Sequence, residues 1–275
     1  MPALGAQTGP VFLVYRAAAA LDAITARVTG EPPLFDFEAA DGVQHTLWLA
    51  TGDARDGLVA AFAAIPALYI ADGHHRAASA ARARNDIRDR AMTHSTMGDD
   101  ADSTTFLGVA FPHDQARILP YNRVVKDLGS LSPADFIAAV RERFDVAPGP
   151  ATPARRGEIA MYFGGAWHTL RPRVRPDDAD PIRTLDVSIL QEQLLEPILK
   201  IGDIRTDRRV DFVGGARGTA ALERLAESGH AAAAFSLHPV SVSDLMTVSD
   251  AGEIMPPKST WFEPKLRDGL LIHLT

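Results

Sequence analysis

The chain has 275 residues, of which 46% are hydrophobic, so it can bury one large core or two modest ones. Its 28 basic and 35 acidic residues give a formal net charge of -7, which argues against a general nucleic-acid-binding protein with a basic face. The absence of cysteine excludes disulfides, thiolate metal sites and cysteine nucleophiles. The start of the chain lacks a basic segment, and the apolar run 11–15 is too short for a signal or membrane span. We therefore expect a cytoplasmic protein.

The first third of the chain predicts short strands that alternate with helices. The expected elements are a buried strand at 11–15, a helix at 17–28, a hairpin of 34–38 with 43–50, and a helix at 55–65. Residues 67–71 then predict another buried strand, which Asp72-Gly73 interrupts. The alanine-rich run 74–85 predicts a helix directly after that interruption, because alanine is the strongest helix former.

The rest of the chain predicts a mixed α/β (α+β) fold with several antiparallel hairpins. Pro148-Gly-Pro150 with Pro153 is the best candidate for a linker, so we expect two parts, 1–147 and 154–275, closely packed on each other. The expected elements are a polar loop at 99–104, a strand at 106–111, a helix capped by Ser132 that runs to about Phe144, a hairpin of 159–163 with 166–170, a helix at 185–200 in which Pro197 marks a kink or the last turn, a strand at 210–213, a helix at 219–227, a strand at 231–237, a helix at 241–249, and a closing hairpin of 261–266 with 270–274.

The most informative motif is Asp72-Gly-His-His-Arg76, which lies between the predicted strand and the alanine-rich helix. The N-terminus of a helix has unpaired N–H groups and the positive end of the helix dipole. Two imidazoles and a guanidinium on the first turn add positive donors, and phosphate is the commonest anion bound in such a place. The motif therefore predicts a site for a phosphorylated ligand.

Two other interpretations of the motif compete with a phosphate site. Asp72 could serve only as a helix cap while His74 and His75 are solvated surface residues. A metal site is the weaker alternative, because neighbouring helical residues point about 100° apart and do not share a face. Zinc helices place their histidines four residues apart, so we expect no metal site.

Two more segments gather polar side chains after strands or rigid prolines. Pro120-Tyr-Asn-Arg123 follows a predicted strand, and Met255-Pro-Pro-Lys-Ser-Thr260 places a cation and two hydroxyls after two prolines. The second segment suits a carboxylate or phosphate, although it could equally be the entry to a strand. From these segments we take Arg123, Lys258, Ser259 and Thr260 as candidate substrate-binding residues.

On five stretches that occur in order along nearly the whole chain, the protein resembles a known family. The stretches are Ala6-Gln-Thr-Gly-Pro10, Ala71 to Arg76, Ile118 to Val124, Leu185-Asp-Val-Ser188 and Met255 to Thr260. The family is a bacterial and archaeal one of unknown function that carries the Ala-Asp-Gly-His-His-Arg motif. It belongs to the ParB/sulfiredoxin-like superfamily and is similar to the archaeal free L-serine kinase. The resemblance implies a ParB/sulfiredoxin-like core in residues 1–147, followed by a second α/β portion.

The chain also departs from these relatives. Family members usually begin with a further section bearing a Pro-Pro-Tyr-Asp-type motif, which we expect to be absent here. In the related kinase the carboxylate that deprotonates serine precedes the histidine motif, in the part of the chain that we expect to be absent here. The resemblance therefore implies the nucleotide-binding half of the site more firmly than the half that binds the acceptor. The family has Thr-His-Arg where this chain has Tyr121-Asn122-Arg123. Sulfiredoxins use a cysteine at the position of His74, so the lack of cysteine excludes their chemistry.

The resemblance implies an ATP- or ADP-dependent phosphotransferase of the free-serine-kinase type, with Mg²⁺. Gly73, His74, His75 and Arg76 would bind the nucleotide phosphates, and Asp72 and His75 would be catalytic. Asp72 is the carboxylate in the motif that could act as general base. For a kinase we also expect Lys258 or Arg123 to point toward the same pocket as His75. The alternatives are a non-catalytic or truncated nucleotide-binding regulatory protein and a ParB-like nucleotide switch acting on DNA. We expect a nucleotide and a small-molecule substrate as partners, and neither a membrane nor nucleic acid.

Overall fold

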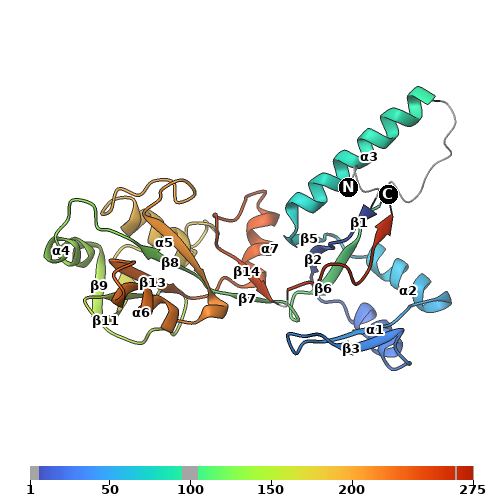
Figure 1. Ribbon diagram of the computed structural model, residues 1–275, viewed down its shortest axis with the longest axis horizontal. Helices are drawn as coiled ribbons and strands as arrows, with labels where there is room; N and C mark the ends of the chain where they lie inside the picture. Colours follow the sequence, from blue (N-terminus) through green and yellow to red (C-terminus); the bar gives the residue numbers. More distant parts are fainter. Residues whose placement is uncertain (1–5, 95–104, 264, 275) are drawn as a thin grey trace. The chain divides into compact units, whose positions relative to one another are not determined.

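The computed structural model describes residues 6–94, 105–263 and 265–274 (Figure 1). The chain forms two compact units, of which unit 1 comprises Met1–Ala116 with Lys265–Thr275 and unit 2 comprises Arg117–Pro264. The fold is mixed α/β, as predicted. The predicted polar loop at 99–104 lies outside the described residues. No helix in the described part of the chain combines the length and the apolar character that crossing a membrane requires.

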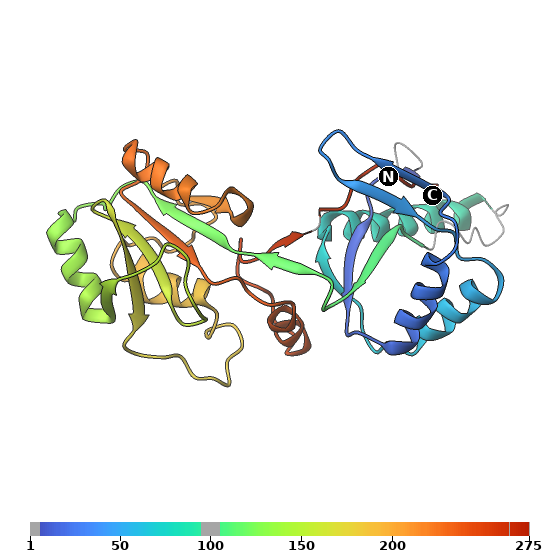
Figure 2. The same ribbon diagram turned by 90° about the horizontal axis from the view of Figure 1, so that it is seen from below.

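Unit 1 is built on the three-stranded sheet β5-β2-β6, whose central strand β2 (Val11–Tyr15) is buried along its whole length. Strand β5 (Tyr69–Asp72) is antiparallel to β2, and β6 (Gly108–Pro112) is parallel to it. Helices α1 (Ala19–Thr29) and α2 (Gly52–Ala63) pack on each other (Figure 2). The predicted hairpin is confirmed as β3 (Phe35–Glu38) with β4 (Gln44–Leu47).

Unit 2 is built on a six-stranded antiparallel sheet of order β12-β8-β13-β10-β11-β9. Alternate residues of its strands pack into two different hydrophobic cores, because successive side chains of a strand point to opposite faces of the sheet. Val125 packs with helices α4 and α5 on one face, whereas Val124 packs with α6 on the other. The bounds are β8 (Tyr121–Val125), α4 (Pro133–Arg143), β9 (Phe144–Pro148), β10 (Ile159–Phe163), β11 (Ala166–Pro172), α5 (Asp186–Leu190), β12 (Val210–Gly214), α6 (Ala220–Glu227), β13 (Ala233–Leu237) and α7 (Val242–Asp250).

Several predicted elements differ from those observed. The predicted closing hairpin is wrong: β14 (Trp261–Glu263) pairs with β7 (Arg117–Leu119), and β15 (His273–Leu274) pairs with β1 (Ala6–Gln7). The predicted helix at 185–200 is instead α5 followed by the π-helix η2 (Gln191–Leu195). The proline-rich segment 148–153 lies inside unit 2, because β9 before it pairs with β11 after it. The division into a nucleotide-binding part and a C-terminal part stays a prediction.

Candidate functional site

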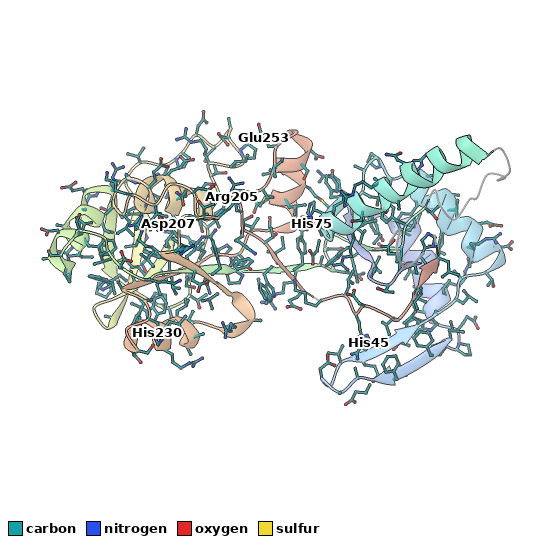
Figure 3. The ribbon with its side chains drawn as sticks, turned by 45° about the horizontal axis from the view of Figure 1, so that its top comes forward. His45, His75, Arg205, Asp207, His230 and Glu253 are labelled. Atoms are coloured by element: carbon teal, nitrogen blue, oxygen red, sulfur yellow. The ribbon has the colours of Figure 1, made fainter. Side chains whose placement is uncertain are left out.

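The motif Asp72–Arg76 forms a strand–turn–helix junction in unit 1. Asp72 is the last residue of β5 and lies opposite Phe12 of β2, and helix α3 (His74–His94) begins two residues later. Figure 3 shows His75 at the start of this helix. The predicted break and helix start are therefore observed, and the helix extends beyond the predicted end at residue 85. Gly73, not Asp72, directly precedes the helix, and its carbonyl accepts a 3.0 Å hydrogen bond from the N–H of Ala77.

The turn requires glycine at position 73. Gly73 has a φ of +89°, a conformation that residues with a Cβ rarely adopt. A Cβ there would lie 3.3 Å from Cα of Val11 and 3.2 Å from Nε of Arg76. The N–H of Gly73 donates a 2.8 Å hydrogen bond to Oδ1 of Asp72, which fixes the carboxylate against the turn. The backbone therefore passes tightly between β2 and the Arg76 side chain.

Arg76 brings the first two family stretches, residues 6–10 and 71–76, together. Its Nη1 donates to Oδ1 of Asp268 at 3.3 Å. A Cβ on Gly9 would lie 2.7 Å from the same oxygen and 3.0 Å from Nη1, so a side chain there would push the ion pair aside. Asp268 belongs to a segment whose sequence predicts a hairpin turn, and nothing in the sequence pattern connects it with Arg76.

Gln7 holds the first stretch in place through a set of backbone contacts. Its Nε2 donates to the carbonyls of Gly9 and Leu107, and its Oε1 accepts from the N–H of Leu107, all at 2.9 Å. The side chain is 3% exposed, so these bonds form away from water. Sequence reasoning placed Gln7 in a family stretch without recognising this role. A buried side-chain amide with three backbone partners fixes the position of Gly9 beside Arg76.

The charges at the junction are accessible to solvent. His74 and His75 are exposed, and the side chain of Arg76 is 36% exposed. Nζ of Lys265 lies 4.0 Å from Oδ2 of Asp72. Exposed ion pairs of this kind contribute little stability, so Arg76 and Lys265 can exchange their carboxylate partners for a stronger anion.

The described residues contain no group of three or more histidine, cysteine, aspartate or glutamate side chains that could hold a metal ion. Mg²⁺, however, is usually bound through one or two carboxylates together with substrate phosphates and water. The half-exposed carboxylate of Asp72 fits that kind of shared site.

Arg123 is in a different environment from the one its sequence context predicts. The cluster 120–123 follows strand β7 as predicted, but Arg123 itself lies in the middle of the next strand, β8, and is 1% exposed. Its Nη1 donates to the carbonyl of Tyr121 and its Nη2 to the carbonyl of Pro257 at 3.4 Å, while the guanidinium lies 5.6 Å from the ring centroid of Phe212. Burial lowers the pKa of Arg123 to about 10, which still leaves it charged at neutral pH.

The segment 255–260 adopts a constrained backbone before it enters β14. Lys258 has a φ of +54°, a left-handed conformation that is uncommon outside glycine, and its Nζ lies 5.7 Å from the ring centroid of Tyr121. The Ser259 hydroxyl is buried and donates to the carbonyl of Pro256 at 2.7 Å, while Thr260 is half-buried. Of the predicted substrate residues, Arg123 and Lys258 thus approach one stretch of chain around Tyr121.

Three of the five family stretches meet at one cavity in unit 2. Arg123 from the third stretch, Val187 and Ser188 from the fourth, and Pro256 and Pro257 from the fifth all line a cavity of about 450 Å³. Gln191 also lines this cavity, and sequence reasoning did not identify it. The predicted approach of Arg123 or Lys258 to His75 stays a prediction, because these residues belong to different units.

Asp186, in the fourth stretch, is a buried carboxyl group with one unpartnered oxygen. Its Oδ1 accepts a 2.8 Å hydrogen bond from the N–H of Gly157, whereas its Oδ2 has no partner among the described residues. Burial raises the pKa of Asp186 to about 6, and the nearby charge of Arg156 only partly opposes this. Sequence reasoning missed this group because an aspartate at a helix start is normally a solvated cap.

A family model described as "Protein of unknown function (DUF1015)" matches residues 1–188. No curated protein matches the chain significantly. Similar solved structures include a free serine kinase in complex with AMP, at 15% identity over 92% of this chain and 83% of that chain, with a TM-score of 0.38. A mutant free serine kinase in complex with ADP is 16% identical over 91% and 83% of the two chains, with a TM-score of 0.37. A conserved hypothetical protein from Pyrococcus furiosus is 13% identical over 94% and 90%, with a TM-score of 0.37.

Proposed function

The chain belongs to the DUF1015 family, and we propose that it is an ATP- or ADP-dependent phosphotransferase that acts on a small hydroxyl-bearing metabolite, similar to free serine kinase. One observation carries this proposal: His74, His75 and Arg76 are accessible on the first turn of a long helix that starts directly after a strand and a left-handed glycine. Helix N–H groups, the helix dipole and three side-chain donors there favour the same anion. A ParB/sulfiredoxin-like core around this junction is part of the proposal.

Each residue of the junction has a role in the proposed reaction. Gly73 lets the phosphates approach the backbone, since a side chain there would crowd the turn. His74, His75 and Arg76 donate hydrogen bonds to phosphate oxygens and stabilise the charge of the transferring group. Asp72 accepts the proton of the attacking hydroxyl or helps to place Mg²⁺, which when bound neutralises phosphate charge.

The acceptor is held, in this proposal, by the candidate substrate residues of unit 2. A metabolite with a carboxylate would pair with the guanidinium of Arg123 or the ammonium of Lys258. Ser259 and Thr260 supply short polar side chains beside these cations. Phosphoryl transfer requires donor and acceptor within near-attack distance, so the reaction would bring these residues opposite His75.

A non-catalytic nucleotide-binding regulatory protein is the second candidate. The observation that favours it is the ion pair of Arg76 with Asp268, which neutralises part of the phosphate site without any substrate. In such a protein the exchange of Asp268 for a phosphate would be the signal. The ParB-like switch on DNA has no specific observation in its favour.

The test is a phosphoryl-transfer assay with the full chain, ATP or ADP, Mg²⁺ and a panel of hydroxyl-bearing amino acids and hydroxy acids, followed by ³¹P NMR. We expect one acceptor to yield a phosphomonoester. We expect His75→Ala to lower the rate at saturating nucleotide by roughly 100-fold or more, the range for losing one transition-state donor. Binding of ADP without transfer to any acceptor would favour the regulatory alternative, and the absence of binding would refute both.

A further inference from the structure

The cavity around Arg123, called here the Arg123 cavity, is open to solvent, and its lining residues all belong to unit 2. The 450 Å³ volume lies in the range of small-molecule sites. Its walls come from β8, from the α5–η2 helix, from the loop that follows η2 and from the prolines before Lys258. The lining residues are Arg123, Val187, Ser188, Gln191, Glu192, Gly202, Asp203, Ile204, Arg205, Pro256 and Pro257.

The first feature of the cavity is an uncompensated positive charge. Arg123 is 1% exposed and donates to the carbonyls of Tyr121 and Pro257, and no carboxylate among the described residues forms an ion pair with it. The two acids of the lining already have partners, since Glu192 pairs with Arg183 at 3.0 Å and Asp203 with Arg205 at 2.9 Å. A buried charge without a counter-charge is costly, so an anion that enters the cavity would be bound strongly by Arg123.

The second feature is a hydrogen-bond acceptor on Gln191 that receives no hydrogen bond from the described residues. Nε2 of Gln191 donates to the carbonyls of Ile201 and Gly202, both at 2.8 Å, which fixes the orientation of the amide. Its Oε1 is buried and has no partner among the described residues. A buried polar atom without a partner is uncommon in native proteins and calls for one. Gln191 also begins a π-helical turn, a rare conformation that is frequent at functional sites.

We propose that the Arg123 cavity binds a small carboxylic acid that carries a hydrogen-bond donor beside the carboxylate, with Gln191 as the residue that selects the donor. The carboxylate pairs with the guanidinium of Arg123, and a neighbouring N–H or O–H donates to Oε1 of Gln191. Both α-amino and α-hydroxy acids share this chemistry. Identifying this acid with the phosphoryl acceptor rests on the proposed function, whereas its binding requires neither nucleotide nor transfer.

The experiment is calorimetric titration of the full chain, without nucleotide, with L-alanine, L-lactate and propionate. These three acids are similar in size but carry an ammonium, a hydroxyl or no donor beside the carboxylate. We expect L-alanine or L-lactate to bind roughly tenfold more tightly than propionate, the order expected for one buried hydrogen bond. A preference for L-alanine would identify the donor as an ammonium, and a preference for L-lactate would identify it as a hydroxyl.

Variants separate recognition from a structural role of Gln191. Gln191→Met should abolish the preference over propionate, because methionine offers no acceptor of comparable strength. Gln193→Met is the matched control: Gln193 is two residues away, its Nε2 donates to the carbonyl of Val174 at 2.9 Å, and it does not line the cavity. It should retain the preference. Arg123→Lys, which keeps the charge but loses the planar fork, should weaken binding of all three acids.

Several outcomes would overturn the inference. These are equal affinity for the three acids, no binding of any of them, a uniform loss of affinity in Gln191→Met that keeps the preference, or tighter binding of inorganic phosphate than of every carboxylate. If the acids bind as expected but ADP does not bind, the proposed function fails and this site stands. If ADP binds and no acid does, the site fails and the proposed function stands.

Discussion

Arg76 and Arg123 show how one residue type can serve two purposes in this chain. Arg76 is partly exposed and engaged in a long ion pair with Asp268, whereas Arg123 is buried and bonded only to carbonyls. Sequence reasoning could select both as anion-binding candidates, because each lies in a polar cluster. It could not predict their burial, since arginine is normally exposed and only tertiary packing encloses it. It missed Asp268 because this residue acts through Arg76, 192 residues away in the sequence, and it missed Gln191 because the contacts of this side chain appear only in the fold.

At Arg76 we predict a specific effect on nucleotide binding. Arg76→Ala should weaken ADP binding by about 1.5–3 kcal/mol, the range for losing a hydrogen bond to a charged group. The free energy of unfolding without ligand should change little, because the ion pair is long and its Asp268 partner is largely exposed to solvent. Titration calorimetry measures the first quantity and urea denaturation the second.

Arg84→Ala is the control for this prediction, because Arg84 lies on the same helix, is exposed and lies away from the motif. It removes the same charge and should leave ADP affinity within about twofold, as expected for a screened surface charge. Equal losses in Arg76→Ala and Arg84→Ala would mean that only overall charge matters, and the assignment of Arg76 would then be wrong.

Among the elements, those with strong local signals were predictable and those that depend on distant partners were not. The strand–turn–helix at 67–85 follows from an apolar run, Asp-Gly and alanines, and Ser132 caps α4 as predicted, accepting from the N–H of Asp135 at 3.1 Å. The closing hairpin failed because β14 pairs with β7 and β15 with β1, both far away in sequence. The π-helical turn after α5 has no distinct sequence signal.

The turn between β5 and α3 can be tested through Gly73. Gly73→Ala should lower the free energy of unfolding by about 1–2 kcal/mol for the left-handed backbone alone. It should also weaken ADP binding, because the new Cβ would lie 3.2 Å from Nε of Arg76 and displace this side chain. Gly42→Ala is the matched control: Gly42 has a φ of +78° but no atom within 4 Å of the added Cβ. It should lose similar stability and no affinity, so unchanged ADP affinity in Gly73→Ala would count against the site.

The start of α5 should make stability depend on pH through Asp186. Its pKa is raised from 3.8 to about 6, mainly by burial, with opposing contributions from the Gly157 N–H and Arg156 and reinforcing ones from Asp244 and Glu158. The native state therefore holds this proton more tightly than the unfolded state. The resulting stabilisation is complete below about pH 4 and is lost as the pH rises through about 6.

Asp186→Asn stays neutral and should not show this loss. The unfolding free energy of the variant minus that of the wild type should therefore rise by up to about 3 kcal/mol between pH 4 and pH 7.5. Burial raises the pKa of Glu158, but Arg171 and Arg155 outweigh it and leave this pKa lowered, so its stabilisation has the opposite pH dependence. Glu158 is present in both proteins and largely cancels in the difference. A difference that stays constant across this range would contradict the prediction.

At the scale of the whole molecule, the five family stretches fall into two groups. Residues 6–10 and 71–76 meet at Arg76 in unit 1, and the other three stretches meet at the Arg123 cavity in unit 2. The proposed phosphate site lies in unit 1 and the proposed acid site in unit 2, so each can be tested by its own ligand. The central claim is that nucleotide phosphates bind at the start of α3.

Hydrogen–deuterium exchange of the full chain, with and without saturating ADP, tests this claim most directly. Bound phosphates would accept hydrogen bonds from the first N–H groups of α3, so the peptide covering residues 69–80 should exchange more slowly with ADP. In Arg76→Ala at the same ADP concentration this protection should largely disappear. Unchanged exchange of residues 69–80 in wild-type protein with ADP, whether ADP protects another part of the chain or none, would contradict the account.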